Sequence, residues 1–392
     1  MIIVLLWLFI LAILYTYFGY PALLTLLARL RPEPEPFPRL IPSVTLLVPA
    51  YNEEAVITQK VENSLNLDYP DEKFQVIVIS DGSDDRTADI VLGYADQGIE
   101  LSHSDERLGK MGAIQRAIPL VRGEIIVFTD ATNFFEPNAI QELVLPFADP
   151  SVGVVTGAKS IIQGDGAMGA SEGFYWKYES FILRQENRLG CCTAASGDSM
   201  AIRREIYDAG DTDVFTEDFH MAMRVIRRGY RVIHAPKVPS YERVSISAKY
   251  EKERRARIVA GRYQAIFMAH KLLPPDRPLV AWQIISHKFM RPLVPLFMIG
   301  ALLSNLLIAA KPEAPKIYEI LLYFQFIFYA AALIGNFVKT SDAFGKLLYL
   351  PTFLVNSNIA ALMGLYRFLT KQQTVLWKRV PRREEDALNR EK

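Results

Sequence analysis

Long apolar segments at both ends of the chain restrict its possible folds more than any other feature. A helix needs about 20 apolar residues to cross the hydrocarbon layer of a bilayer. Four nearly uncharged segments approach or reach that length: Ile2–Leu27, Leu293–Ala310, Ile317–Val338 and Leu347–Leu365. The sequence therefore predicts a membrane protein with an N-terminal transmembrane helix in residues 1–30 and a C-terminal membrane region of two or three spans in residues 291–370.

The charges beside the first segment indicate its orientation. Cytoplasmic flanks of membrane spans carry an excess of lysine and arginine, and Arg29, Arg31 and Arg39 follow this segment whereas only Met1 precedes it. We expect the N-terminus outside and the middle of the chain in the cytoplasm. A cleaved secretory signal is the alternative, but the apolar run is too long for one, no positive region precedes it and no small-residue cleavage site is evident.

Polar residues interrupt the last apolar segment. Pro351 and residues 356–358 (Asn-Ser-Asn) lie near its middle, and such side chains are costly against lipid. The polar tail, residues 371–392, contains the positively charged sequence KRVPRR and should stay in the cytoplasm. We therefore expect a re-entrant or interfacial segment. A full span whose polar side chains are shielded by other helices is the alternative.

The charge-rich middle of the chain has the pattern of an α/β domain. Repeated prolines in residues 31–42 predict an extended linker. From residue 43 to about residue 275, short β-branched runs alternate with helical stretches, as in a largely parallel sheet. The expected strands are Val44–Val48, Gln75–Ile79, Glu124–Phe128, Val152–Thr156 and Arg231–Ala235. Lys249–Ala269 predicts a long basic helix, and residues 279–290 (LVAWQIISHKFM) predict an amphipathic helix in the membrane interface.

Composition disfavours several classes of protein. The net charge of +1 at pH 7 implies no nucleic acid or other polyelectrolyte as a partner. Cys191 and Cys192 are adjacent, a poor arrangement for a structural disulfide, which agrees with a reducing compartment. The five histidines show no metal-ligand spacing, so a zinc site is not expected.

Acidic turns follow three of the predicted strands, in VPAYNEE, SDGSDD and TDATN. Ligands of open α/β sheets bind beyond the carboxyl ends of the strands, so these carboxylates crowd one crevice and need a cation or ligand to offset their charge. A nucleotide sugar fits, because Glu53 and Asp81 can accept hydrogen bonds from its base or ribose and Tyr51 can stack on it. Asp130 can hold Mg²⁺ or Mn²⁺ against the diphosphate. For residues 83–85 (Ser-Asp-Asp) a helix cap is an equal alternative.

Further charged residues complete the predicted site. Glu217 and Asp218 begin a helix, where acidic side chains also suit the helix dipole, so one of them can be purely structural. Asp218 is the better candidate for the base that takes the proton from an attacking hydroxyl. Lys110 precedes a helix and can reach a phosphate, although a solvated surface lysine is the alternative. Three arginines share one helix turn, which is favourable only if they meet phosphates, carboxylates or lipid headgroups: Arg254, Arg255 and Arg257.

The order and spacing of VPAYNEE, SDGSDD, GKMGAIQ, TDATN, SGDSMAIRRE, TED and RRARI resemble the processive membrane glycosyltransferases of family 2, which include cellulose, hyaluronan, chitin-oligosaccharide and poly-N-acetylglucosamine synthases. The resemblance covers nearly the whole chain. It implies an α/β GT-A (Rossmann-like) fold for residues 43–275, a nucleoside-diphosphate sugar donor, a divalent cation and inversion at the anomeric carbon. It also implies site residues: Tyr51, Glu53 and Asp81 for the nucleotide, Asp130 for the metal, Asp218 for the base, and Gly197 and Asp198 near the acceptor.

Two departures from the family's motifs bear on function. The D-x-D motif becomes Asp130-Ala131-Thr132, which lacks the second metal carboxylate, so Asn133 or a phosphate oxygen would have to fill that position. The Q-x-x-R-W motif becomes RRARI, in which Ile258 replaces the tryptophan that lies beneath the acceptor sugar in the polymer synthases. Loss of this stacking platform leaves transfer of a single sugar to a lipid-linked acceptor as an alternative to chain elongation.

The sequence therefore predicts an inverting glycosyltransferase of the bacterial inner membrane with a cytoplasmic catalytic domain. Its expected partners are a UDP-linked sugar donor, a glycan or lipid-linked hydroxyl acceptor and membrane lipids. A transporter is disfavoured because the apolar segments lack paired ionisable residues. A nucleotidyltransferase is disfavoured because it would leave the TED and RRAR motifs unexplained.

Overall fold

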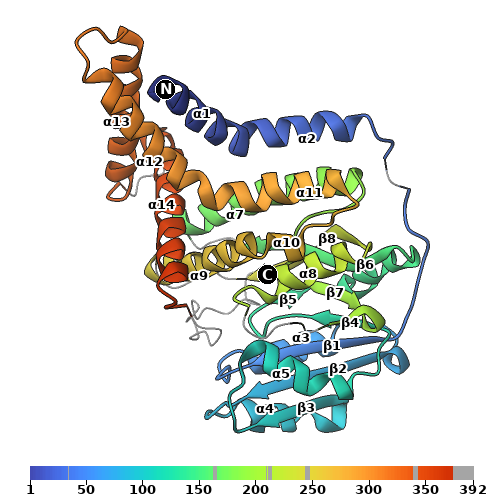
Figure 1. Ribbon diagram of the computed structural model, residues 1–392. Helices are drawn as coiled ribbons and strands as arrows, with labels where there is room; N and C mark the ends of the chain where they lie inside the picture. Colours follow the sequence, from blue (N-terminus) through green and yellow to red (C-terminus); the bar gives the residue numbers. More distant parts are fainter. Residues whose placement is uncertain are drawn as a thin grey trace. The chain divides into compact units, whose positions relative to one another are not determined.

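The computed structural model describes residues 1–33, 35–161, 166–208, 210, 214–242, 248–338 and 343–373. The chain forms two compact units (Figure 1). The sheet unit comprises Arg31–Glu251 and His270–Val280, and the helical unit comprises Met1–Leu30, Lys252–Ala269 and Ala281–Gln373. Most of the predicted polar tail, from residue 374 onward, lies outside the described residues.

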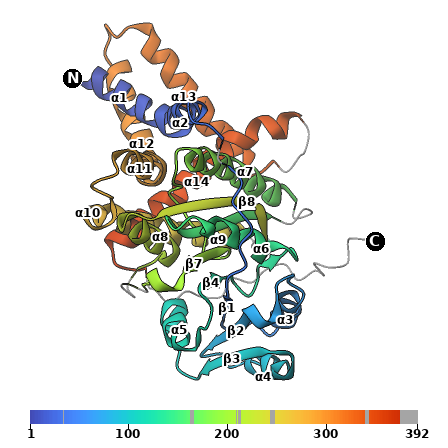
Figure 2. The ribbon, with the colours of Figure 1, turned by 90° about the vertical axis from the view of Figure 1, so that its right-hand side faces the viewer.

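A mixed eight-stranded sheet forms the centre of the sheet unit, in the order β3-β2-β1-β4-β7-β6-β8-β5 (Figures 1 and 2). The strands are β1 (Val44–Ala50), β2 (Phe74–Asp81), β3 (Ile99–Ser104), β4 (Ile125–Phe128), β5 (Phe134–Phe135), β6 (Val152–Ile161), β7 (Met200–Arg203) and β8 (Arg231–Glu242). β3, β2, β1 and β4 run parallel, and so do β6 and β8, whereas β7 is antiparallel to both β4 and β6. The antiparallel strand β7 thus joins two parallel groups.

All five predicted strands are present, because each is a β-branched apolar run that the sheet buries. In β1 and β2, Leu46, Val48, Ile77 and Ile79 are fully buried, as expected for parallel strands covered on both faces. β3, β5 and β7 are not predicted from the sequence. β3 (IELSHS) is a half-exposed edge strand, and β5 has only two residues, so neither has a strong apolar pattern.

The register of the sheet brings three strand ends to one edge. Ala50, the last residue of β1, pairs with Ser80 of β2, and Leu47 of β1 pairs with Phe128, the last residue of β4. The loops that follow β1, β2 and β4 therefore emerge at the same edge, where open α/β sheets bind their ligands.

Helices of the sheet unit connect these strands. They are α3 (Ile57–Leu65), α4 (Thr87–Leu92), α5 (Gly109–Ala117), α6 (Ala139–Val144), α7 (Gly166–Arg188), α8 (Glu217–Arg227) and the short α10 (Ala269–Leu272). Each helix that follows β1, β2, β3 or β4 begins after a strand end at the ligand edge, so the first turns of α3, α4 and α5 contribute residues to that edge.

The helical unit contains the segments of membrane-spanning character. Its helices are α1 (Ile2–Leu14), α2 (Tyr20–Arg29), α9 (Ala248–Phe267), α11 (Pro278–Ile284), α12 (Met290–Ala309), α13 (Lys316–Gly335) and α14 (Ala343–Leu369). π-helical turns at Tyr15–Gly19 and Ile285–Phe289 join α1 to α2 and α11 to α12. Within the described residues, four helices are long and apolar enough to cross a membrane: Ile2–Arg29, Pro278–Ala309, Lys316–Gly335 and Leu347–Leu369.

The two π-helical turns face each other through polar side chains. The Tyr15 hydroxyl lies 2.7 Å from Ser286 Oγ and accepts a hydrogen bond from Trp282 Nε1 at 2.9 Å. The rings of Tyr20 and Trp282 pack at a centroid distance of 5.2 Å. These contacts pair polar groups that would be costly against lipid.

The predicted amphipathic helix of residues 279–290 is not a separate element. It continues through the π-helical turn into α12, so one helix runs from Pro278 to Ala309. Trp282 and Ser286 of this segment contact Tyr15 of the first helix. The membrane depth of residues 279–290 stays a prediction.

The polar residues of the last apolar segment all have protein partners. Asn356 Nδ2 donates to Asn336 Oδ1 at 2.8 Å, and Asn358 Nδ2 donates to the Tyr17 hydroxyl at 3.2 Å. Ser357 Oγ accepts from Arg255 at 2.9 Å. A full membrane span requires other helices to shield its polar side chains, and these contacts provide that shielding. The cost of polar groups against lipid therefore does not argue against a full span.

The second half of α14 nevertheless packs along α9, which is rich in charged residues. The Arg255 guanidinium lies 5.4 Å from the Phe353 ring as well as on Ser357, and Phe267 packs on Phe368 at 5.2 Å. A helix as charged as α9 is disfavoured in hydrocarbon, so an interfacial position stays the prediction for this part of α14. This packing supports the interfacial prediction for the segment.

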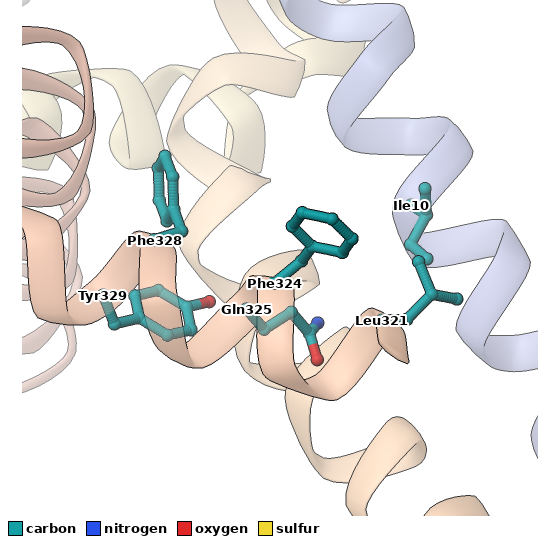
Figure 3. A pocket seen from close by; sticks show the side chains of 6 residues that line it. All are labelled: Ile10, Leu321, Phe324, Gln325, Phe328 and Tyr329. Carbon is teal, nitrogen blue, oxygen red and sulfur yellow. The ribbon is translucent and has the colours of Figure 1, made fainter. Parts of the chain in front are cut away.

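A pocket of about 230 Å³ opens between α1 and α13 (Figure 3). Ile10 of α1 faces a row of α13 side chains: Leu321, Phe324, Gln325, Phe328 and Tyr329. Its lining is largely apolar and carries no charged group, so it does not suit a charged substrate. The candidate active site is at the ligand edge of the sheet.

Candidate active site

Two loops follow the adjacent strands β1 and β2, residues 51–56 and residues 82–87, and we call them the loop pair. Asp81, which ends β2 just before the second loop, is buried. Its two carboxylate oxygens accept hydrogen bonds from the backbone N–H groups of Leu108 at 2.9 Å and Gly109 at 2.8 Å. Asp81 thus fixes the start of α5, and each oxygen keeps a further lone pair for a ligand.

The other acidic residues of the loop pair hold the two loops together. Asn52 and Asp84 exchange two hydrogen bonds, Asn52 Nδ2 to Asp84 Oδ1 at 2.6 Å and Asp84 N to Asn52 Oδ1 at 3.0 Å. Asp85 accepts from Glu54 N at 3.1 Å and from Thr87 N at 2.9 Å. Asp85 thus accepts a hydrogen bond from the first residue of α4, whose N-cap residue is Arg86.

Tyr51 and Glu53 lie in the first loop of the pair. The Arg107 guanidinium stacks on the Tyr51 ring at 3.7 Å from its centroid, so one face of this ring already has a partner. Gly82 makes the close approach possible: its φ is +68°, and a Cβ there would lie 2.8 Å from Arg107 Cβ. Glu53 is largely buried, and its backbone N–H donates to Thr87 Oγ1 at 2.8 Å. Sequence reasoning did not single out Arg107, although it stands in the same ERLGK stretch as Lys110.

Lys110, in the first turn of α5, connects two predicted carboxylates. Its Nζ lies 2.7 Å from Asp130 Oδ1, after β4, and 3.4 Å from Glu217 Oε1, at the start of α8. Burial opposes the charge of Lys110, but the Asp130 and Glu217 carboxylates outweigh it and raise the pKa of this lysine above its ordinary value. The ammonium is therefore charged and is the cation around which these two carboxylates gather.

Asp218 and Gly197 lie next to this ion pair. Asp218 Oδ2 accepts a hydrogen bond from Gly197 N at 3.1 Å, which orients the carboxylate. A Cβ on Gly197 would lie 3.3 Å from Asp218 Cβ and 3.4 Å from Lys110 Nζ, so any larger residue there would press on both. Asp218 is partly exposed and starts α8. It combines a fixed orientation with access, as a general base requires.

Asp198 lies deeper than its neighbour Gly197. Its carboxylate is buried and pairs with Lys159 Nζ at 3.1 Å, with Asn133 Nδ2 at 3.2 Å and with Ser199 Oγ at 3.2 Å. Asn133 also donates to Ser240 Oγ at 2.9 Å, whereas its Oδ1 has no hydrogen-bond partner within the described part of the chain. The contacts of Asp198 are thus with the protein, and its predicted role near an acceptor stays a prediction.

Lys60 is a buried cation of this site that sequence reasoning missed. Its Nζ is fully buried and donates to Thr129 Oγ1 at 3.0 Å and to the Asn133 carbonyl at 2.5 Å, on either side of Asp130. Burial lowers the pKa of Lys60 to about 7, although the charges of Asp130 and Asp198 act in the opposite direction. The signal was available: within ITQKVENSL, Lys60 occupies the buried helix face, where an unpaired lysine would be costly. Three lysines now form the lysine cluster: Lys60, Lys110 and Lys159.

The three predicted arginines lie on α9, in the helical unit. Arg255 donates to Ser357 of α14, so part of its interaction is with a neighbouring helix. The contribution of Arg254, Arg255 and Arg257 to donor binding stays a prediction. The structure brings together the others in two groups: Tyr51, Glu53 and Asp81 at the loop pair, and Asp130, Gly197, Glu217 and Asp218 around Lys110.

The mixed sheet and its acidic ligand edge define a GT-A-like glycosyltransferase fold. The mannosyltransferase PcManGT from Pyrobaculum calidifontis, solved in complex with GDP-Man and Mn²⁺, matches this chain with a TM-score of 0.69 at 24% sequence identity, over 94% of this chain and 100% of that chain. The predicted α/β GT-A class is therefore confirmed.

Residues 45–210 match the family described as Glycosyl transferase family 2, so the chain contains a family-2 glycosyltransferase domain. The beta-monoglucosyldiacylglycerol synthase of Trichormus variabilis is 30% identical over 226 residues, which cover 54% of this chain and 47% of that protein. The poly-beta-1,6-N-acetyl-D-glucosamine synthase of Staphylococcus aureus is 28% identical over 202 residues, 49% of this chain and 48% of that protein. The chain thus aligns with about half the length of these relatives. The predicted recognition as a glycosyltransferase is confirmed.

Proposed function

We propose that this protein transfers a sugar, with inversion, from a nucleoside-diphosphate sugar to a hydroxyl acceptor at the cytoplasmic face of a membrane, in glycolipid or polysaccharide synthesis. One observation carries the proposal. The Asp218 carboxylate, oriented by Gly197 N at 3.1 Å, lies beside a cation bound to Asp130 and Glu217. A base and a site for the charge of a leaving group are thus adjacent at the ligand edge.

The reaction assigns Asp218 a defined proton. Asp218 takes the proton of the acceptor hydroxyl as the hydroxyl oxygen bonds to the anomeric carbon. The bond from that carbon to the diphosphate oxygen breaks on the opposite face, and its electron pair leaves with the nucleoside diphosphate. Attack opposite to the leaving group inverts the anomeric configuration. Gly197 keeps Asp218 aimed, since its N–H holds one carboxylate oxygen.

The residues around Lys110 fit a divalent cation. Asp130 and Glu217 supply carboxylate oxygens, the ligands that Mg²⁺ and Mn²⁺ prefer, and both already converge on a positive charge. Asn133 Oδ1, without a hydrogen-bond partner within the described residues, is a further oxygen close to Asp130 in sequence. When bound, the metal offsets the charge of the diphosphate. Asp130 is its proposed ligand in this chain.

The loop pair is the proposed nucleotide site. Asp81 keeps lone pairs for the base or ribose, and Tyr51 with Arg107 forms a flat cationic surface on which a base can stack. We expect UDP as the nucleotide. Because the similar mannosyltransferase binds GDP-Man, a direct comparison of UDP- and GDP-sugars decides this point.

Ile258 favours transfer of one sugar at a time. It stands on α9 at the position where the polymer synthases carry an acceptor-stacking tryptophan, and an aliphatic side chain offers no equivalent platform for a sugar ring. The relative named for diacylglycerol glucosylation also supports a lipid acceptor for this chain.

The test is transfer of radiolabelled sugar in membranes that contain the protein. UDP- and GDP-linked hexoses are offered in turn, and the product is separated into lipid-soluble and polymer fractions. We expect label from a UDP-sugar in a lipid fraction that carries one added residue. Absence of transfer from every nucleotide sugar would refute the function, and a long polymer would refute single-sugar transfer alone.

A further inference from the structure

Lys110 occupies the space between Asp130 and Glu217 that a metal bridging these two carboxylates would take. Its Nζ is 2.7 Å from Asp130 Oδ1 and 3.4 Å from Glu217 Oε1. A divalent cation that bridges two carboxylates bonds to their oxygens at about 2.0–2.2 Å. Two cations cannot share that space, because their repulsion would cancel the attraction of the carboxylates.

We propose that the Lys110 ammonium holds Asp130 and Glu217 until the donor binds, and that it then moves to the diphosphate and yields these carboxylates to the metal. Metal and nucleotide diphosphate then bind together and not one by one. This inference rests on the proposed function, since it describes how the donor and its cation enter the same site.

The ligand count of the site supports the same order of events. Thr132 stands where the second carboxylate of the D-x-D motif would be. Among the described residues, no group of three or more His, Cys, Asp or Glu side chains could hold a metal ion. Mg²⁺ requires about six oxygen ligands, so a metal alone finds too few here and must in addition displace Lys110. The diphosphate of the donor supplies the missing oxygens.

Lys110 can move without disturbing the fold. Its ammonium is a point charge at the end of a flexible four-carbon stem, and a Cβ at Gly197 would lie 3.4 Å from Nζ, so the missing side chain of this glycine leaves space beside the ammonium. Lys60 and Lys159 differ. Lys60 Nζ is fully buried between Thr129 and Asn133, and Lys159 pairs with the buried Asp198. Within the lysine cluster, the ion pair with Asp130 at 2.7 Å is made by Lys110.

The experiment measures Mn²⁺ binding by the purified full-length protein in neutral detergent, from the electron paramagnetic resonance signal of free Mn²⁺, with and without UDP. We expect weak binding without UDP and binding tighter by on the order of tenfold or more with it; the same factor must appear in UDP affinity when Mn²⁺ is added. Equal Mn²⁺ affinity with and without UDP would overturn the proposal, and this comparison needs no variant.

Variants at Lys110 test whether this lysine causes the coupling between Mn²⁺ binding and UDP binding. Lys110→Met should bind Mn²⁺ more tightly than the wild type without UDP, and the coupling between UDP and Mn²⁺ should shrink. Lys110→Arg keeps the charge and should behave as the wild type. Lys73→Met removes an exposed lysine that donates to the Ile41 carbonyl and pairs with no predicted site residue, so it should leave Mn²⁺ affinity unchanged. A Lys110→Met protein that is folded by thermal unfolding yet binds Mn²⁺ no better than wild type would overturn the exchange.

Sugar transfer by the same preparation separates the two proposals. Transfer from a nucleotide sugar without any coupling of Mn²⁺ and UDP would refute the exchange and keep the function. Coupled binding without transfer from any nucleotide sugar would refute the function and keep the exchange.

Discussion

The two sides of the candidate site neutralise their carboxylates in different ways. At the loop pair, Asp81 and Asp85 accept hydrogen bonds from backbone N–H groups that also begin helices. At the lysine cluster, Asp130 and Asp198 face ammonium groups at 2.7 and 3.1 Å. Backbone donors are fixed by the fold, whereas a lysine can exchange its partner by rotating its stem. We infer that the loop pair is a rigid surface for recognition and that Lys110, within the lysine cluster, is where charge is redistributed during the reaction.

The largest effect is expected at the base. Asp218→Asn removes the proton acceptor but keeps the size of the side chain, so sugar transfer should fall by about 10²–10⁴-fold, while UDP affinity measured by calorimetry stays nearly unchanged. Asp208→Asn is the matched control, since Asp208 pairs with Arg228 and with no predicted site residue. Wild-type turnover in Asp218→Asn would show that the base is another group.

Metal removal probes the same side of the site. We expect EDTA to stop transfer and added Mg²⁺ or Mn²⁺ to restore it, because the charge of the leaving diphosphate needs an offset. Activity is followed in one sample before chelation, after it and after readdition. Full activity after exhaustive chelation would mean that lysine and arginine side chains supply this offset without a metal.

The loop pair should respond through binding and not through turnover. Asp81→Ala should weaken UDP affinity by about tenfold or more, since hydrogen bonds to a charged group contribute roughly 1.5–3 kcal/mol. Asp85→Ala is a matched control, because Asp85 also accepts two backbone N–H groups but uses them to join the loop pair and the start of α4. If both variants lose the same affinity, Asp81 acts by holding the loops and not by contacting the nucleotide.

The sequence predicted the candidate carboxylates of the site better than it predicted their hydrogen-bond and ion-pair partners. Strand ends and acidic turns singled out Asp81 and Asp130 as candidates, since residues after β-branched runs emerge at the ligand edge, and the start of a helix singled out Asp218. Partners were harder to predict, because an ion pair such as Lys110 with Asp130 joins residues on different elements. Lys60 was missed because sequence patterns treat a lysine as a surface residue, whereas here the fold surrounds it with acceptors.

The fold shows a similar limit. The apolar strands of the parallel groups were predicted, but β7 was not: its four residues, Met200–Arg203, form a strand only because β4 and β6 flank it. The helix Pro278–Ala309 was divided in two at residue 290, since the amphipathic pattern of its first part hides its contact with Tyr15. Long-range packing decides both features.

A buried histidine outside both sides of the candidate site should make the stability of the fold depend on pH. Burial lowers the pKa of His234 in β8 to about 4, and its Nε2 lies 2.9 Å from Ser180 Oγ. Between about pH 6.5 and pH 4, the unfolded chain therefore binds more protons at this histidine than the folded chain does. The free energy of unfolding loses nothing at His234 above this pH window, and it decreases as the pH falls through the window. We expect thermal unfolding of His234→Gln to show a smaller loss from pH 7 to pH 5 than the wild type; equal losses would contradict the assignment.

The proposed reaction at the cytoplasmic face of the membrane requires that the sheet unit lies on that side. The side on which the chain's end lies depends on α14, because a full span would carry the tail outside. Its second half packs on the charged helix α9, through Arg255 with Ser357 and through Phe267 with Phe368. Since such a helix is disfavoured in hydrocarbon, we expect α14 to end at the interface and the positively charged tail to stay inside.

Cysteine labelling of intact cells with a membrane-impermeant reagent tests this orientation with the smallest change to the protein. The native Cys191 and Cys192 are buried free thiols and give little background. Glu313→Cys, in the exposed turn between α12 and α13, should be labelled, whereas Glu72→Cys in the sheet unit should be labelled only after lysis. We expect Asn389→Cys to behave as Glu72→Cys. If it is labelled in intact cells together with Glu313→Cys, the tail is outside, α14 crosses the bilayer, and its contacts with α9 must then be made by a part of α9 that enters the membrane with it.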